Sequence, residues 1–266
     1  DAGDRIASSS DQDLVGLNPD RGFEVYVAEL DAADLNTQVT DTGRQFSILP
    51  DLSGDGRYVA YVSSNDIYRA EVALVSILTP TWSITRTRVT TLTEPGGYND
   101  QPSVSEHGQY IAFVSDQDIL SGGNGDGNRE IFRAEIGPSG LITSVQVTSS
   151  TVGVNELPSI SWDGQKIVFV SDQDLTGENT DGIRQVFLAE FFAPTQVFSL
   201  TQLTLDPGDK DEPTISADGA RVAYVSVSDG RLHLLDLFEN REKVEDTSGG
   251  KAYPAISSNG TDIVYV

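Results

Sequence analysis

The chain has 266 residues, 38% of them hydrophobic, and its 10 Phe and 9 Tyr recur at regular places, which excludes a disordered chain and allows one large all-β domain. Its 41 Asp and Glu against 17 Lys and Arg give a formal net charge of −24, which excludes binding to nucleic acid and favours cations or basic partners. There is no Cys for a disulfide or thiolate site, and no apolar run approaches the roughly 20 residues needed for membrane insertion.

The first 40 residues are predicted to contain three strands of a unit that the rest of the chain repeats. Residues 4–14 align with the second strand of the unit and the start of the segment after it, residues 23–30 with the third strand and residues 38–40 with the fourth. Five further units each begin at a proline, and these prolines recur at intervals of roughly 40 to 55 residues, close to the length of a propeller blade. Pro50 is followed by DLSGDGRYVAYVSS, Pro102 by SVSEHGQYIAFVSD, Pro158 by SISWDGQKIVFVSD, Pro213 by TISADGARVAYVSV and Pro254 by AISSNGTDIVYV.

Each unit is predicted to hold four short antiparallel strands. The first strand ends at a two-residue turn such as Asp163-Gly164, because Asp-Gly and Asn-Gly supply the positive φ angles of a tight hairpin. His107 takes the Asp position in one unit and is interpreted as a turn residue. The second strand is almost wholly apolar, as expected for burial on both faces. The third is typified by residues 131–135, and the fourth carries Gln-Val-Thr, as at residues 146–148.

These units resemble the TolB-like (PD40) repeat of the WD40-like propellers, which reads P-x-[WF]-S-P-D-G-x-x-I-A-F-x-S, then I-Y, then L-T. The resemblance implies an all-β propeller of four-stranded antiparallel blades, in which residues 1–266 form a single domain. The count of repeats predicts five blades with the ring closed by pairing of the N- and C-terminal strands, or six if the chain is trimmed. The proline before Asp-Gly is missing here, and only Trp162 is aromatic near that turn. The resemblance also implies a periplasmic or secreted protein.

Three units carry an Asp-rich insertion between the second and third strands, at residues 11–24, 116–130 and 172–185. Their side-chain oxygens are of the kind that calcium prefers, although the complete EF-hand pattern is absent. Calcium is therefore a candidate ligand. The alternative is that these side chains cap their own turns. The candidate metal ligands are Asp11, Asp13, Asp116, Asp118, Asn124, Asp126, Asn128, Glu130, Asp172, Asp174, Asn179 and Asp181.

A second acidic group precedes the first strand of three units and comprises Asp100, Glu156, Asp211 and Glu212. In a propeller the loops entering the first strand and those between the second and third strands emerge on the same face. Both acidic groups are therefore expected around the mouth of the central channel, where they would attract cations or a basic partner. The alternative is that these residues cap the entry to the strand.

The sequence offers little support for catalysis. It has no Gly-x-Ser-x-Gly, His-Glu-x-x-His or phosphate-loop motif, and His233 lies where other units carry Phe or Tyr, which favours a packed strand residue. Carboxylate pairs such as Asp116 and Asp118 recur in three units, whereas a catalytic pair is needed once. No catalytic residue is assigned.

Three functions remain open from the sequence. The favoured one is a non-catalytic binding or scaffolding propeller of the cell envelope or extracellular space, which holds a protein, peptide or glycan partner on its acidic face. The second is the propeller part of a hydrolase or lyase. The third is a structural subunit of an extracellular assembly, in which unfinished terminal strands support self-assembly by edge pairing.

Overall fold

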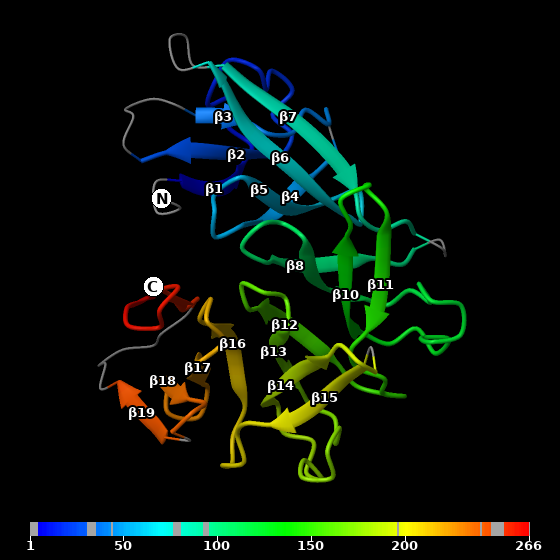
Figure 1. Ribbon diagram of the computed structural model, residues 1–266, viewed down its shortest axis with the longest axis vertical. Helices are drawn as coiled ribbons and strands as arrows, with labels where there is room; N and C mark the ends of the chain where they lie inside the picture. Colours follow the sequence, from blue (N-terminus) through cyan, green and yellow to red (C-terminus); the bar gives the residue numbers. More distant parts are fainter. Residues whose placement is uncertain are drawn as a thin grey trace.

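Antiparallel sheets account for the fold, and each repeated unit of the sequence forms one of them. The computed structural model describes residues 5–30, 36–43, 45–76, 81–92, 96–195, 197–239, 241–245 and 253–265. Within these ranges, 21 strands form six sheets, here called sheets 1 to 6 in chain order. The predicted all-β propeller of four-stranded antiparallel blades is confirmed (Figure 1).

The strand order within every complete sheet follows the chain. Sheet 1 contains β1 (Arg5–Ser10), β2 (Glu24–Glu29) and β3 (Asn36–Gln38), and sheet 2 contains β4 (Ser47–Leu52), β5 (Tyr58–Ser63), β6 (Asp66–Ser76) and β7 (Thr81–Arg88). Sheet 3 contains β8 (Asn99–Val104), β9 (Tyr110–Ser115), β10 (Glu130–Ile136) and β11 (Ile142–Gln146). Sheet 4 contains β12 (Asn155–Ile160), β13 (Lys166–Ser171), β14 (Gln185–Phe192) and β15 (Val197–Gln202). Sheet 5 contains β16 (Lys210–Ile215), β17 (Arg221–Ser226), β18 (Arg231–Asp236) and β19 (Arg241–Glu245), and sheet 6 contains β20 (Ala255–Ile256) and β21 (Ile263–Val264).

The hairpin after each first strand differs in type from the predicted two-residue turn. The backbone N–H of Gly56 donates to the carbonyl of Ser53 at 2.8 Å, and Gly56 has a φ of 68°, whereas Asp55 is not among the residues with positive φ. Asp55 instead accepts the backbone N–H of Arg57 at 3.0 Å through its Oδ1 atom. The Asp therefore caps the turn with its side chain, and only the Gly supplies the left-handed conformation.

The innermost strands of sheets 2 to 5 each have a bulge at their proline. The residue before the proline has a positive φ in all five units, with values from 50° to 54° at Leu49, Gln101, Leu157, Glu212 and Tyr253. The register with the second strand shifts there, for example between Asp100 and Ser103. A proline is tolerated because this strand has a partner on one side only, so its missing N–H leaves no gap in the ladder.

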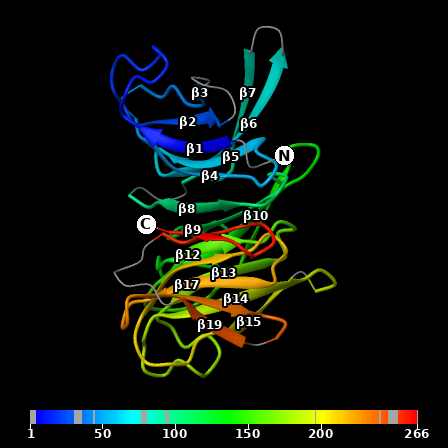
Figure 2. The ribbon, with the colours of Figure 1, turned by 90° about the vertical axis from the view of Figure 1, so that its left-hand side faces the viewer.

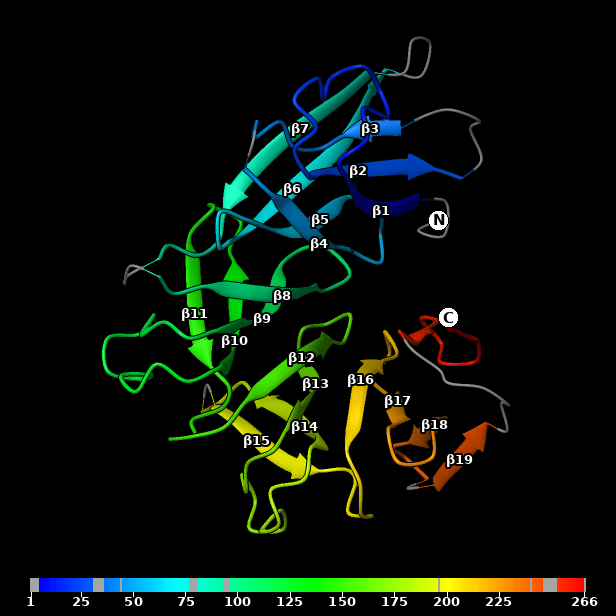
Figure 3. The same cartoon turned by 180° about the vertical axis from the view of Figure 1, so that it is seen from behind.

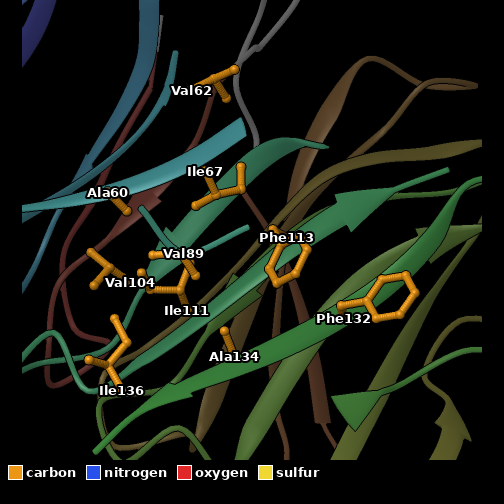
Figure 4. Packing of buried hydrophobic residues seen from close by; sticks show 10 residues of the cluster. All are labelled: Ala60, Val62, Ile67, Val89, Val104, Ile111, Phe113, Phe132, Ala134 and Ile136. Atoms are coloured by element: carbon orange, nitrogen blue, oxygen red, sulfur yellow. The ribbon is translucent and has the colours of Figure 1, made fainter. Parts of the chain in front are cut away.

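The core consists of four layers, one between each pair of consecutive sheets from sheet 1 to sheet 5. Figure 4 shows the layer between sheets 2 and 3, where Ile67, Ile111, Phe113 and Phe132 are fully buried. The rings of Phe113 and Phe132 stack with centroids 5.8 Å apart. Neighbouring residues of the same second strand, such as Ala112, belong to the next layer. This use of both faces explains why the second strands are apolar throughout.

The first and last sheets are incomplete counterparts of the others. Sheet 1 corresponds to the second, third and fourth strands of a unit, and sheet 6 to the first and second. Both lie on the same side of the molecule (Figures 1 and 3), and the side view shows the sheets stacked one after another (Figure 2). No ladder among the described residues joins β1 to sheet 6, so ring closure by pairing of the terminal strands stays a prediction. The described residues also contain no helix long and apolar enough to cross a bilayer.

Candidate functional site

The second Asp of each Asp-Gln-Asp loop caps the loop from within. Its Oδ1 atom accepts the backbone N–H of an asparagine five or six residues later, and that buried asparagine donates from Nδ2 to a backbone carbonyl farther along the loop. The Asp-to-Asn bonds join Asp13 to Asn18 at 2.9 Å, Asp118 to Asn124 at 3.2 Å and Asp174 to Asn179 at 2.9 Å. The asparagines donate to Gly22, Asn128 and Ile183, each at 2.9 Å.

Asp118 shows why this arrangement competes with a cation. Its carboxylate also accepts the backbone N–H groups of Gly122 at 2.7 Å and Gly123 at 2.9 Å. These donors, Gly122 first, hold the pKa of the carboxyl below its usual range. Across the residues that the structure describes, no three His, Cys, Asp or Glu side chains are grouped so that they could hold a metal ion. Calcium in these loops stays a prediction.

The other predicted ligands are dispersed. The Oδ1 atom of Asp116 accepts the backbone N–H of Tyr98 at 2.8 Å, and that of Asp172 accepts Val154 at 2.9 Å, so both tie the loop to the entry of the first strand. Asp126 and Asp181 lie on exposed loop tips. Asp11 accepts a hydrogen bond from the side chain of the neighbouring Gln12, and Asn128 donates to the carboxylate of Glu130.

Glu130, predicted as a metal ligand, is a fully buried residue at the centre of a group of hydrogen bonds between sheets 3 and 4, here called the latch. Its Oε2 atom accepts the hydroxyl of Thr148 and, at 3.0 Å, the amide of Asn155 in sheet 4. Its Oε1 atom accepts the backbone N–H of Ser150 at 2.6 Å. The Thr148 hydroxyl in turn accepts the N–H of Ile131 at 2.8 Å. The Thr of the Gln-Val-Thr motif therefore lies just beyond the fourth strand and bonds back to the third.

The same latch recurs with different charges. The hydroxyls of Thr40, Thr90 and Thr204 each bond to the residue that begins the third strand, which is Glu24, Asp66 and Gln185, respectively. In the last case the position of Asn155 is taken by the fully buried Lys210, which donates to the carbonyl of Gly208 at 2.6 Å in the loop before its own strand. Sequence analysis missed this latch because Gln-Val-Thr reads as an ordinary strand, although the paired recurrence of Thr and an acid or amide was visible.

Three of the four residues of the predicted acidic face are paired with arginines. Arg129 lies 3.6 Å from the carboxylate of Asp100 and also bonds to Glu156. Arg184 lies 3.3 Å from Glu156 and 3.2 Å from Asp211. The result is an alternating row of three carboxylates and two guanidinium groups, here called the ion-pair row. The row makes this face less negative than its acids alone suggested.

Glu212 lies apart from the row, and its carboxylate accepts the backbone N–H of Tyr253 in the last unit. The arginines that the sequence analysis missed share one position, immediately before the first residue of the third strand. Sheet 1 has Phe23 at that place, where it contacts Phe46 with centroids 6.0 Å apart. The equivalent part of the face is therefore apolar, and both rings are exposed.

The innermost strands enclose a channel whose two halves are separate cavities. A cavity of about 710 Å³ opens beside the ion-pair row, with Leu49, Leu157, Glu212 and Tyr253 among its lining residues. A second cavity of about 410 Å³ lies toward the Asp-Gly turns and is lined in part by Trp162. Five positions line both cavities and so form the waist of the channel, and they are Asp51, Ser103, Ser159, Thr214 and Ala255.

Asp51 is the one ionisable residue at the waist. Its Oδ2 atom accepts the backbone N–H of Val104 in the next sheet at 2.6 Å. At the same position of the following two sheets, the hydroxyl of Ser103 accepts the N–H of Ile160 at 3.3 Å and that of Ser159 accepts the N–H of Ile215 at 3.2 Å. Burial raises the pKa of Asp51 from its ordinary 3.8 to about 6, although hydrogen bonds from Val104 and Ser103 oppose the shift. Sequence analysis passed over Asp51 because the residue after the proline varies from unit to unit.

His233 lies at the aromatic position of its unit, buried in β18 and stacked on Tyr224 with centroids 5.1 Å apart. Its two ring nitrogens lie 2.6 Å from Glu242 and 3.4 Å from Asp229. The pairs Phe113 with Phe132 and Tyr61 with Tyr68 stack in the same way in other sheets. His233 is therefore a packed strand residue. His107 lies at a turn, 3.0 Å from Asp55.

The same architecture occurs in known proteins. No curated protein matches the chain. Among solved structures, TolB from Acinetobacter baumannii is 22% identical with a TM-score of 0.62, and the match covers 99% of this chain but only 58% of that one. A TolB from Agrobacterium tumefaciens is 19% identical with a TM-score of 0.59, covering 86% and 72%. A puromycin-hydrolysing peptidase from Mycobacterium tuberculosis is 14% identical with a TM-score of 0.55, covering 91% and 38%.

These identities establish the fold alone. The family model described as the TolB beta propeller domain matches residues 15–266, which is nearly the whole chain. The chain therefore belongs to the TolB beta-propeller family.

Proposed function

We propose that this chain is a non-catalytic binding propeller of the periplasm or extracellular space, which holds a polypeptide partner at the channel mouth beside the ion-pair row. The observation that carries the proposal is the 710 Å³ cavity at this mouth, which is large enough for side chains of a partner. Its rim combines exposed apolar residues with acids. Tyr253 is 74% exposed and Leu49 is 46% exposed.

The rim is constrained by local contacts, which favours a binding role. Leu49 and Tyr253 both have positive φ values; the bulge of β4 lies at Leu49, and the backbone N–H of Tyr253 donates to the carboxylate of Glu212. The ion-pair row fixes the neighbouring arginine side chains, since each guanidinium contacts two carboxylates. A pre-organised surface loses less conformational entropy when a partner binds.

The test is affinity capture from the envelope fraction of the source organism with rim variants of the immobilised protein. Leu49→Asn combined with Tyr253→Asn removes the apolar rim, and Asn tolerates the positive φ at both positions. Phe238→Asn is the matched control, because Phe238 is 82% exposed but lies on the turn after β18. We expect one partner to be retained by the wild type and the control and lost from the rim variant. Equal retention by all three proteins would reject this mouth as the binding site.

The alternative that the chain is the propeller part of a hydrolase or lyase has Asp51 in its favour. It is a single carboxylate with a raised pKa inside a channel, and it is not repeated in the other units. A screen of peptides and glycans checks this alternative. Turnover that is lost in Asp51→Asn would support it, and a screen without turnover would leave the binding function.

A further inference from the structure

The channel end opposite the ion-pair row carries an exposed tryptophan that only one unit possesses. Trp162 precedes an Asp-Gly turn and is 56% exposed. It lines both the 410 Å³ cavity of the channel and a smaller adjoining cavity of about 220 Å³. The residues at the same place in the other units are smaller or polar, namely Gly54, Glu106, Ala217 and Ser258.

The fold uses the backbone of Trp162 but not its indole ring. The Trp162 N–H donates to the carbonyl of Ala217 at 3.0 Å, and the Trp162 carbonyl accepts the N–H of Glu106 at 3.1 Å. The Asp55 N–H bonds to the Glu106 carbonyl at 3.1 Å in the preceding junction, so the pattern does not depend on the side chain. The two bonds hold the main chain on both sides. The indole ring itself makes no hydrogen bond and no aromatic or cation–π contact with the described residues, and it is exposed beside the cavity.

The surroundings of the ring are acidic. The 220 Å³ cavity is lined by Trp162, Ala217 and two carboxylates, Asp163 and Asp218. Each carboxylate uses its Oδ1 atom for its own turn, accepting the hydroxyl of Ser161 at 2.7 Å or of Ser216 at 2.6 Å. The Oδ2 atoms accept no hydrogen bond from the described residues, and neither carboxylate belongs to an ion pair there.

The equivalent turn in sheet 2 makes a useful contrast. Asp55 has a histidine partner, since His107 lies 3.0 Å from its Oδ2 atom. The 410 Å³ cavity adds Asp51 and Glu106 to the acids near Trp162, and no Lys, Arg or His lines either cavity. The site thus combines an aromatic face with two carboxylates that belong to no ion pair among the described residues, and Arg133, which donates to the carbonyl of Gly164, acts on Asp163 from a greater distance.

We propose that Trp162, Asp163 and Asp218 form a binding site for an alkylammonium cation, in which the cation lies against the indole face and the carboxylates balance its charge. Tryptophan is the aromatic side chain that attracts cations most strongly, and quaternary and primary ammonium groups are the ligands for which such sites are known. The cation has two sources, a small free molecule with a quaternary ammonium group or a lysine side chain of a polypeptide. This site is distinct from the proposed partner site, which lies at the other end of the channel.

Binding can be measured by indole fluorescence in a Trp82→Phe background, in which Trp162 is the only tryptophan. Choline represents the free quaternary ammonium source. Nα-acetyl-lysine amide, whose side-chain ammonium group is free, represents the lysine source. 3,3-Dimethylbutan-1-ol is the matched control for choline, because it has the same shape without the charge. We expect saturable binding of at least one of the two cations and none of the alcohol.

The variants then test the residues. Trp162→Ala should fold, because the equivalent position of the next unit already carries Ala217. It is expected to weaken binding about two- to fivefold by isothermal titration calorimetry, as the loss of a cation–π contact at an exposed ring requires. Asp163→Asn with Asp218→Asn is expected to weaken it by a similar factor, while Leu49→Asn with Tyr253→Asn at the opposite mouth leaves it unchanged. The tighter of the two cations identifies the source. The proposal is wrong if neither cation binds, if the alcohol binds equally well, or if Trp162→Ala binds like the wild type.

Discussion

The junction between sheets 3 and 4 and the junction between sheets 4 and 5 use the same latch with opposite charge. At the first, Glu130 is the buried acceptor and the next sheet contributes the neutral Asn155. At the second, Gln185 is neutral and the next sheet contributes the buried Lys210, which pairs with Asp206 at 3.0 Å. The threonine hydroxyl is the shared element. The comparison shows that the repeat preserves the bond from the threonine hydroxyl to the third strand, while the sign of the buried charge beside it changes and Lys210 is balanced by Asp206.

The largest expected effect comes from removing the shared hydroxyl at the charged acceptor. Thr148→Val takes one donor from the buried Glu130 carboxylate and the acceptor from the Ile131 N–H. We expect a loss of about 3 kcal/mol in the free energy of unfolding. Thr204→Val is the matched variant and should cost about 1 to 2 kcal/mol, because its acceptor is the neutral Gln185. Urea unfolding measures both, and equal losses would contradict the role given to charge.

The junction between sheets 2 and 3 differs from its neighbours at the channel waist, where Asp51 replaces a serine. Its raised pKa means that the folded protein binds the proton more tightly than the unfolded chain, so stability falls as the pH rises from about 4 to about 6. Asp51→Asn removes this dependence and keeps an acceptor for Val104. Relative to the wild type it should gain about 1 to 2 kcal/mol between pH 4 and pH 7. Urea titrations at both pH values test this, and a constant difference would refute it.

The three Asp-Gln-Asp loops, unlike the junctions between sheets, share one hydrogen-bond pattern, in which the second Asp caps the N–H of a buried asparagine. Asp174→Ala removes the cap from the N–H of Asn179 and should cost about 1 kcal/mol. If capping is the main role, the melting temperature falls equally in calcium and in EDTA. If the loops hold calcium, the wild type melts at a higher temperature in calcium and Asp174→Ala loses that gain. Thermal unfolding with elemental analysis distinguishes the two outcomes.

The smallest effect is expected in the ion-pair row. Arg184→Gln breaks the contacts to Glu156 and Asp211, and Arg129→Gln breaks those to Asp100 and Glu156. Each should cost about 0.5 to 1 kcal/mol at low salt and less at high salt, since these groups remain partly solvated. A double-mutant cycle with Glu156→Gln measures the coupling. A salt-independent loss of several kcal/mol would mean that the row is a buried structural element instead.

The fold could be predicted from the sequence because a turn ending in Gly, with Asp before it in three units, and an apolar second strand are local signals that five units repeat. The site could be predicted only in part. The positions of Asp100, Glu156 and Asp211 follow from the repeat, but their pairing with Arg129 and Arg184 joins side chains from different sheets. The turn type was wrong because Asp-Gly fits two hairpin geometries, and the backbone of Asp55 takes the one that needs a single positive φ.

The layered core has a consequence for how the protein opens. Sheets 2, 3 and 4 each contribute side chains to two layers, so separating any of them from the rest disrupts both. The short hairpin of sheet 6 packs against β16 and β17 with two-residue strands. Amide protons of β9 and β13 should therefore exchange with deuterium only through global unfolding, whereas those of β20 and β21 exchange through local opening. A mechanical pull on the two ends would meet its main resistance in the middle sheets.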